Sequence, residues 1–221
     1  MQEVEAHLNR PTALLADIHG NLKALDAVLT ELRGWGVEHI IVAGDLLFGG
    51  DESLGVWRRL MECKAYLIRG LSDTALSLLH PDQLKPQNEE EERKKALFLK
   101  TRKEVGELVL HRLARLPEQL RFGLPGGKEM LVCHGSPRDP GIDLSFELSD
   151  DEIAYLLGEE AKDFVAAGGS HVAFDRVYEN TQIIGLGSVG ASPDGETAHF
   201  AVLLPDEAEI KVERGWVRLR K

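Results

Sequence analysis

The sequence predicts an α/β protein in which two β-sheets pack face to face and helices cover their outer sides. Two apolar runs near the N-terminus, residues 12–16 and 39–43, flank a segment with helical periodicity. A strand–helix–strand unit with continuous apolar strands is typical of a parallel sheet with helices on its faces. The C-terminal part instead reads as a succession of strands. This change of pattern indicates a second sheet.

The first predicted strand, residues 12–16, ends in an aspartate and a histidine two residues apart. Side chains at i and i+2 of an extended segment point to the same side, so Asp17 and His19 can converge just beyond the strand. Gly20 permits a tight turn, and Asn21 is a suitable N-cap for a helix. The buried stripe of that helix is expected to consist of Leu22, Leu25, Val28, Leu29 and Leu32. The pair Asp17 and His19 is the usual start of a metal site; the alternative is a capped turn with a surface histidine.

Three more predicted strands end in residues that carry chemistry. The second, residues 39–43, is followed by Asp45, the third, residues 65–68, by Arg69, and the fourth, residues 130–133, by His134. Parallel strands end at the same edge of a sheet, so Asp45 is expected beside Asp17 and His19. A helix between the second and third strands is indicated by the spacing of Leu54, Trp57, Leu60 and Met61.

Residues 81–116 differ in character and predict a helical insertion. Asn88 precedes a run of four glutamates, which is typical of a capped helix start that matches the helix dipole. Helical spacing continues through Leu97, Thr101, Val105, Leu108 and Leu116. A polar helix is expected over residues 150–164, a β-rich part over 168–221, and strands within it over 182–184, 198–204, 210–213 and 216–219. No linker or repeat interrupts residues 1–221, so a single domain is expected.

Composition limits the classes of function. The 221 residues carry a formal charge of −11, from 26 basic and 37 acidic residues, which disfavours binding to duplex nucleic acid. Cys63 and Cys133 have no metal-type spacing and read as buried free thiols of a reducing compartment. Residues 1–11 lack the apolar core of a secretion signal, and no run has membrane-spanning length. A cytoplasmic location is therefore expected; whether the chain forms a homo-oligomer is left open.

Four short motifs together resemble the calcineurin-like metallophosphoesterases, in particular the small bacterial and archaeal phosphoesterases that begin Asp-x-His-Gly-Asn. They are Asp17-Ile18-His19-Gly20-Asn21, Gly44-Asp45-Leu46, His134-Gly135-Ser136-Pro137 and Gly187-Ser188-Val189-Gly190. The resemblance spans roughly residues 12–192. It implies the four-layer α/β/β/α sandwich of that family, which agrees with the two sheets inferred above.

The resemblance also implies a site and a reaction. Family members usually hold two divalent metals that activate a water for the hydrolysis of phosphate mono- or diesters. By position, Asp17, His19 and His171 would hold the first metal and Asp45 would bridge. His134 would belong to the second metal, which makes His134 and Asp45 the catalytic candidates. Mixed nitrogen and oxygen donors favour a transition metal such as Mn, Fe, Zn or Ni.

The sequence departs from the family pattern around the second metal. Leu71 stands where the family has a metal-binding Asn, Ser72 where it has a His that assists phosphate binding or leaving-group protonation, and Gly169 where it has a second-metal His. One tight metal site is therefore expected, with the second weak or absent. The resemblance implies a small phosphate ester or nucleotide as substrate, with low or altered activity. The alternative is a catalytically silent member that binds a nucleotide, a phosphate ligand or a protein partner.

Two arginines near the predicted strand ends are candidates for binding the substrate phosphate. Arg69 ends the third strand, and Arg138 follows the His134 motif. Either guanidinium could hold a phosphate bidentately, although Arg69 could equally pair with a carboxylate. The glycines of residues 185–190 fit a dinucleotide-binding fingerprint, but turn residues follow them instead of the helix that this fingerprint must open. A nucleotide-dependent oxidoreductase is therefore not expected.

Overall fold

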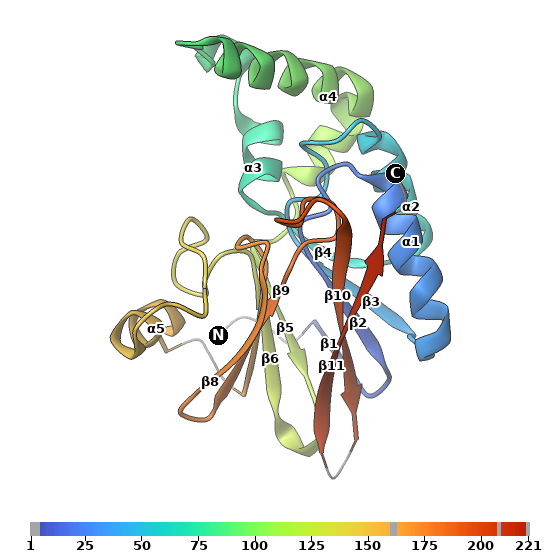
Figure 1. Ribbon diagram of the computed structural model, residues 1–221, viewed down its shortest axis with the longest axis vertical. Helices are drawn as coiled ribbons and strands as arrows, with labels where there is room; N and C mark the ends of the chain where they lie inside the picture. Colours follow the sequence, from blue (N-terminus) through green and yellow to red (C-terminus); the bar gives the residue numbers. More distant parts are fainter. Residues whose placement is uncertain (1–4, 160–162, 207–208, 220–221) are drawn as a thin grey trace.

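The computed structural model describes residues 5–159, 163–206 and 209–219. Within these residues two β-sheets lie face to face, and helices cover the outer side of each (Figure 1). The predicted α/β/β/α sandwich is confirmed.

Each sheet contains a group of parallel strands, and the candidate site residues follow the carboxyl ends of these strands. Over the described ranges, one sheet has the order β11-β10-β2-β3-β4, with β2 Thr12–Leu15, β3 His39–Ala43, β4 Tyr66–Ile68, β10 Thr197–Pro205 and β11 Ile210–Arg218. The other has the order β1-β5-β6-β7-β9-β8, with β1 Ala6–His7, β5 Gln119–Gly123, β6 Glu129–Cys133, β7 Phe164–Ala167, β8 Ala173–Tyr178 and β9 Thr181–Leu186. The β2–β3–β4 and β6–β7–β9 pairings are parallel, and β10 is antiparallel to both neighbours.

The helices form the outer layers and one end of the molecule. They are α1 Leu22–Leu32, α2 Ser53–Glu62, α3 Leu71–Leu78, α4 Glu89–Leu113 and α5 Asp150–Leu157, with short 3₁₀ turns at η1 Arg33–Trp35, η2 Pro81–Gln83 and η3 Pro125–Gly127. In Figure 1, α1 and α2 flank one sheet, α5 flanks the other, and α3 and α4 lie above the strand ends. Among the described helices, none is both long and apolar enough to cross a bilayer.

Three apolar layers hold the sandwich together, and each central strand contributes to two of them. Leu14 on β2 packs between the sheets, while Ala13 and Leu15 pack against the helices. On β6, Val132 faces the space between the sheets and Leu131 faces α5. Strands buried on both faces have no polar side to show, which explains the uninterrupted apolar runs in the sequence.

The insertion helix α4 begins as predicted and then changes its buried face. Asn88 caps it through its side-chain oxygen, which accepts from the backbone N–H of Glu91 at 2.9 Å. Gly106 has a φ of 76° inside the helix and interrupts its regular turn. Leu108, expected in the buried stripe, is therefore 69% exposed, and Leu110 is buried instead. The constant spacing assumed from the sequence does not continue past this glycine.

Several strand and helix boundaries differ from the sequence prediction. Helix α5 ends at Leu157, since Gly158 adopts a φ of 57°, and Phe164, the last residue of the predicted helix, begins β7, which was not predicted. Strands β1, β5 and β8 are short or polar and were not predicted. The two predicted C-terminal strands are one strand, β11, because Gly215 leaves room for the ring of Phe200 on β10: a Cβ on Gly215 would lie 2.1 Å from that ring.

The two sheets approach closely at the carboxyl ends of their parallel strands. Gly168, directly after β7, lies against the end of β3: a Cβ at this position would be 2.6 Å from the carbonyl oxygen of Ala43 and 3.0 Å from Cβ of Ala16. Both neighbours are backbone or backbone-proximal atoms that cannot move aside. The residue at 168 must therefore be glycine for the sheet ends to meet.

We expect Gly168→Ala to separate the sheet ends and to lower the free energy of unfolding by about 1–3 kcal/mol, as overpacking does. The matched control is Gly34→Ala, where an added Cβ would meet nothing within 4 Å and stability should stay the same or rise by up to ~1 kcal/mol. Urea unfolding measures both. Equal stabilities for the two variants would contradict this close approach.

Candidate metal centre

Both sheets contribute candidate ligands at the edge where they meet. Asp17 lies two residues after β2, and Asp45 lies two residues after β3 of the same sheet. His134 directly follows β6, and His171 follows β7 of the opposite sheet. The site is therefore assembled by packing one sheet on the other, and neither sheet alone carries it.

One cluster consists of Asp17, His19 and His171. The Nε2 atom of His171 lies 3.5 Å from Oδ1 of Asp17, and the Nε2 atom of His19 lies 3.9 Å from the same oxygen. The two Nε2 atoms are 3.1 Å apart. Ligand bonds of about 2.0–2.2 Å allow donors of one ion to stand up to roughly 4 Å apart. These three atoms can therefore reach one metal ion.

A second cluster shares Asp17 and adds Asp45 and His134, with ligand atoms within 4.8 Å of one another. Oδ1 of Asp45 lies 3.5 Å from Nε2 of His134, while Oδ2 lies 3.8 Å from Nε2 of His19. The two oxygens of one carboxylate thus face the two clusters. This is the arrangement that a bridging ligand requires.

Backbone carbonyls orient the imidazoles for metal binding. Nδ1 of His19 is 2.8 Å from the carbonyl oxygen of Phe48, and Nδ1 of His134 is 2.9 Å from that of Ala43. A carbonyl only accepts, so each Nδ1 carries the proton and each Nε2 offers a lone pair to the cluster.

The charge distribution calls for a cation. Asp17 is fully buried, and its Oδ1 has no hydrogen-bond partner, although Oδ2 accepts from the N–H of Gly169 at 3.0 Å. A buried carboxylate oxygen without a partner is costly. In addition, the Nε2 atom of His19 faces that of His171 at 3.1 Å. A divalent cation would satisfy the orphaned oxygen and the facing nitrogens together, so these residues fit a metal.

Backbone strain is concentrated at the same residues. Six non-glycine residues in the described part of the chain have positive φ, and four of them are Asp17 (55°), His19 (49°), Asp45 (52°) and His171 (58°). Left-handed backbone at such residues costs on the order of 1–3 kcal/mol each and clusters at functional sites. The strained backbone therefore coincides with four of the candidate ligands.

Two of the histidines hold their protons more tightly than usual. The Asp17 carboxylate, whose Oδ1 faces Nε2 of His171 at 3.5 Å, is the main cause of the raised pKa of His171, helped by the Ala191 carbonyl against the effect of burial. Burial lowers the pKa of His134, but the charges of Asp45 and Asp17 outweigh it and leave that pKa raised. Protons and metal therefore compete for these nitrogens.

Asp73 stabilises the turn after Asp45 through hydrogen bonds from the backbone. Its fully buried carboxylate accepts from the backbone N–H groups of Leu46, Leu47 and Gly70 at 3.0–3.3 Å. Burial, together with the charge of Asp45, raises the pKa of Asp73 to about 7. Asp73 is the third residue of α3, which begins at Leu71.

The two arginines expected to bind phosphate have other partners in the structure. Arg69 donates to the carbonyls of Ala114 and Leu116 and pairs with Glu118 at 2.7 Å, so its guanidinium ties β4 to the connection between α4 and β5. Arg69 therefore pairs with a carboxylate, as the alternative interpretation of the sequence expected. Arg138 stacks its guanidinium 4.1 Å from the ring centre of Tyr155 on α5. Neither guanidinium joins the ligand clusters, because the packing of α4 and α5 provides each with a nearer partner.

The residues that depart from the family pattern surround the second cluster. Leu71 is 47% exposed at the start of α3. Ser72 donates its N–H to Oδ1 of Asp45 at 2.9 Å, and its buried hydroxyl has no partner. Gly169 lies beside Asp143, a residue that the sequence analysis missed because no spacing rule connects it to the motifs. The only sequence signal for Asp143 was its position a few residues after the His134 motif.

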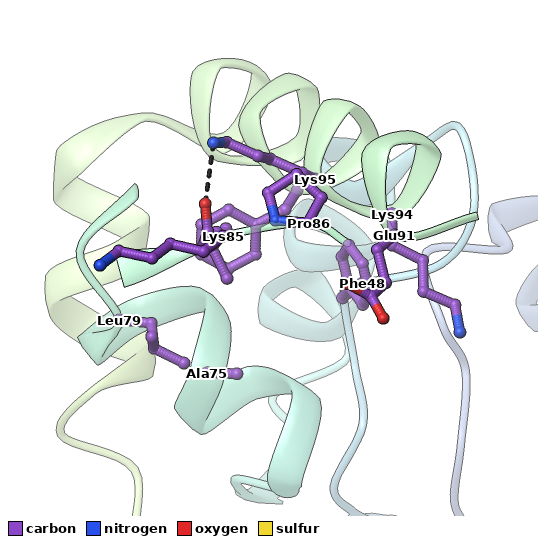
Figure 2. Close-up of a pocket in the computed structure, with 10 residues that line it drawn as sticks. Phe48, Ala75, Leu79, Lys85, Pro86, Glu91, Lys94 and Lys95 are labelled. Carbon is purple, nitrogen blue, oxygen red and sulfur yellow. Dashed lines mark hydrogen bonds between the residues drawn. The ribbon is translucent and has the colours of Figure 1, made fainter. Parts of the chain in front are cut away.

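Two hollows lie near the ligands, but only one of them reaches the imidazoles. A cleft of about 490 Å³ is lined by His19, His171, Asn21 and Lys23 among others. A second, apolar cavity of about 260 Å³ lies between α3 and α4 (Figure 2). Phe48 links the two regions, since its carbonyl accepts from His19 while its side chain lines the apolar cavity.

Comparison with known families identifies this arrangement. The model of the calcineurin-like phosphoesterase superfamily domain matches residues 12–208, a stretch that contains every candidate ligand. The chain belongs to this superfamily. Membership implies a divalent metal, and the two clusters are its candidate ligand groups.

Individual proteins resemble this chain in sequence or in structure, at low sequence identity. An uncharacterized protein of Methanocaldococcus jannaschii is 26% identical over 218 residues, which cover 91% of this chain and 84% of the relative. A hypothetical protein of Pyrococcus horikoshii superposes with a TM-score of 0.81 at 22% identity and covers 96% of this chain and 89% of its own. A metallophosphoesterase of Sphaerobacter thermophilus gives 0.74 at 21% identity, with 96% and 90% covered.

Because Oδ1 of Asp17 is buried without a hydrogen-bond partner, replacing Asp17 should weaken metal binding but should not destabilise the metal-free protein. Asp17→Asn should weaken binding of Mn²⁺ to the metal-free protein by more than about 100-fold, a loss of ~2.8 kcal/mol. It should leave the metal-free protein equally stable or more stable, because it removes an unpaired buried charge. Titration calorimetry and urea unfolding measure the two effects. The exposed Asp82→Asn serves as control, and a variant that loses stability without losing metal would contradict a metal-binding role for Asp17.

The raised pKa values predict how metal binding depends on pH. His134 and His171 must be neutral to bind metal, and both have pKa values above the usual 6.5. Protons should therefore displace metal at a higher pH than they would from unperturbed histidines, with affinity dropping by up to ~100-fold per pH unit once both are protonated. Equilibrium dialysis with Mn²⁺ between pH 8 and pH 5 tests this. A constant affinity over that range would contradict it.

Proposed function

We propose that this chain is a metal-dependent phosphoesterase that hydrolyses small phosphate mono- or diesters, nucleotides included, in the cleft beside His19 and His171. The observation that carries the proposal is the fully buried Asp17 carboxylate, whose free Oδ1 faces the Nε2 atoms of two imidazoles. A bound divalent metal supplies a Lewis acid for a phosphoryl oxygen and lowers the pKa of water.

The chain's own residues prepare the cleft for an anion. Helix α1 points its first turn at the cleft, and that turn holds Lys23 and no acidic residue. The positive end of a helix dipole favours a phosphate there. The apolar cavity of Figure 2 lacks any candidate ligand in its lining, so we assign the phosphate to the cleft.

The residues at the start of α3 set the expected substrate preference. Ser72 replaces the histidine that assists leaving-group departure in the family, and such general acid help is worth about 10²–10⁴-fold. Esters whose leaving groups need no proton, such as 4-nitrophenyl phosphates and nucleotide anhydrides, should therefore react far better than alkyl esters. The silent, ligand-binding alternative rests on the same Leu71 and Ser72 and predicts binding of phosphate without turnover.

The metal-loaded protein is expected to hydrolyse 4-nitrophenyl phosphate or the diester bis(4-nitrophenyl) phosphate, and a chelator should abolish the activity. Asp45→Asn should lower kcat/KM at least about 100-fold, since Asp45 faces both clusters. Asp51→Asn is the matched control, because Asp51 lines the same cleft but pairs with Lys100 at its surface. Mn, Fe, Zn, Ni and Mg are compared as the added metal. No turnover with any of them, in protein shown to contain metal, would favour the silent alternative.

A further inference from the structure

The second cluster has fewer family ligands than the first but a favourable charge distribution. Asp17, Asp45 and His134 bring their ligand atoms within 4.8 Å of one another. The family ligands at positions 71 and 169 are replaced by leucine and glycine. An ion held by the three remaining side chains has coordination positions left for a further donor from this chain.

A carboxylate occupies the space beside Gly169. A Cβ on Gly169 would lie only 2.2 Å from Oδ1 of Asp143 and 3.1 Å from its carboxyl carbon. Gly169 also has a φ of 84°, which disfavours any side chain there. The Asp143 oxygen thus stands where a histidine side chain at 169 would begin, and the two residues cannot both project into this space.

The loop after β6 holds Asp143 in this place. The loop folds back over Gly135, whose missing Cβ would lie 2.4 Å from the Pro140 carbonyl oxygen. Asp139 stabilises the bend, because its carbonyl accepts from the Ser136 hydroxyl at 2.8 Å. The next residue after Asp143, Leu144, is fully buried in the apolar layer beneath α5. Asp143 therefore has an anchored backbone and an exposed side chain.

The charges of the site act on Asp143 directly. Partial burial of its carboxylate raises the pKa of Asp143, the charge of His134 lowers it, and that of Asp17 raises it. Geometry agrees, because Gly169, which lies beside the Asp143 carboxylate, donates its N–H to Oδ2 of Asp17 at 3.0 Å. Independently of Asp143, Oδ1 of Asp17 is fully buried without a hydrogen-bond partner, and a cation at this cluster would compensate its charge.

We propose that Asp143 is a ligand of the second metal position and takes the place of the histidine that is absent at Gly169. The inference rests on the proposed function for the presence of a metal, but metal stoichiometry tests it separately from turnover. Two ions per chain are then expected, not one. The second position would combine the carboxylates of Asp17, Asp45 and Asp143 with one imidazole, an oxygen-rich set that favours Mn²⁺ or Mg²⁺ over softer ions.

Removing the Asp143 charge tests the proposal without disturbing the fold, because the side chain is exposed. Metal-free protein is dialysed against Mn²⁺ over a range of concentrations, and the bound metal is counted by elemental analysis. The wild type should bind two ions per chain. Asp143→Asn should keep the first ion with unchanged affinity and bind the second at least about tenfold more weakly, a loss of ~1.4 kcal/mol.

The matched control is Glu147→Gln, which removes an exposed carboxylate from the same loop and should retain both ions. Thermal unfolding provides a second readout, since saturating Mn²⁺ should raise the Tm of Asp143→Asn less than that of the wild type. A wild type that binds a single ion, or an Asp143→Asn variant that binds both ions as tightly as the wild type, would overturn the proposal. A wild type with two ions and no turnover would overturn the proposed function alone.

Discussion

The carboxylate of Asp17 joins the two sheets and generates the charge that the site must neutralise. It follows β2 of one sheet, yet its Oδ2 accepts from Gly169 after β7 of the other. Its backbone carbonyl accepts from the Ser188 hydroxyl and from the Gly190 N–H beyond β9. These bonds bury the side chain completely and leave Oδ1 without a donor. The contacts that bring the sheet edges together therefore also create the site for a cation.

The fold tolerates local strain at this edge because the surrounding packing is extensive. The left-handed backbone of Asp17, His19, Asp45 and His171 would cost several kcal/mol in an isolated chain. Apolar layers on both sides of β2 and β3 hold the strand ends rigidly in place. Rigid strands with abruptly turned ends aim several donors at one point before any ion arrives, which reduces the ordering cost of binding.

The second metal position shows how a site can change its donors while its geometry persists. Asp45 and His134 stay at their strand ends, where the sheets determine their positions. The other positions around this cluster lie on loops and at the start of α3, which the sheets constrain less. A loop carboxylate can approach the space that Gly169 leaves open, whereas exposed Leu71 offers no donor. Such an exchange would preserve a two-ion centre and alter its metal preference.

The sequence alone determined the sandwich architecture and the strand ends that carry Asp17, His19, Asp45 and His134, because apolar runs and i, i+2 spacing are local properties. It did not determine the direction of Arg69, whose guanidinium is held by the distant Glu118, nor the approach of Asp143 to Gly169. Strands such as β1 and β8 were missed because neighbouring strands, not their own patterns, make them extended. Contacts between the two sheets, and between loops and sheets, join residues far apart in the chain, so only the tertiary structure decided them.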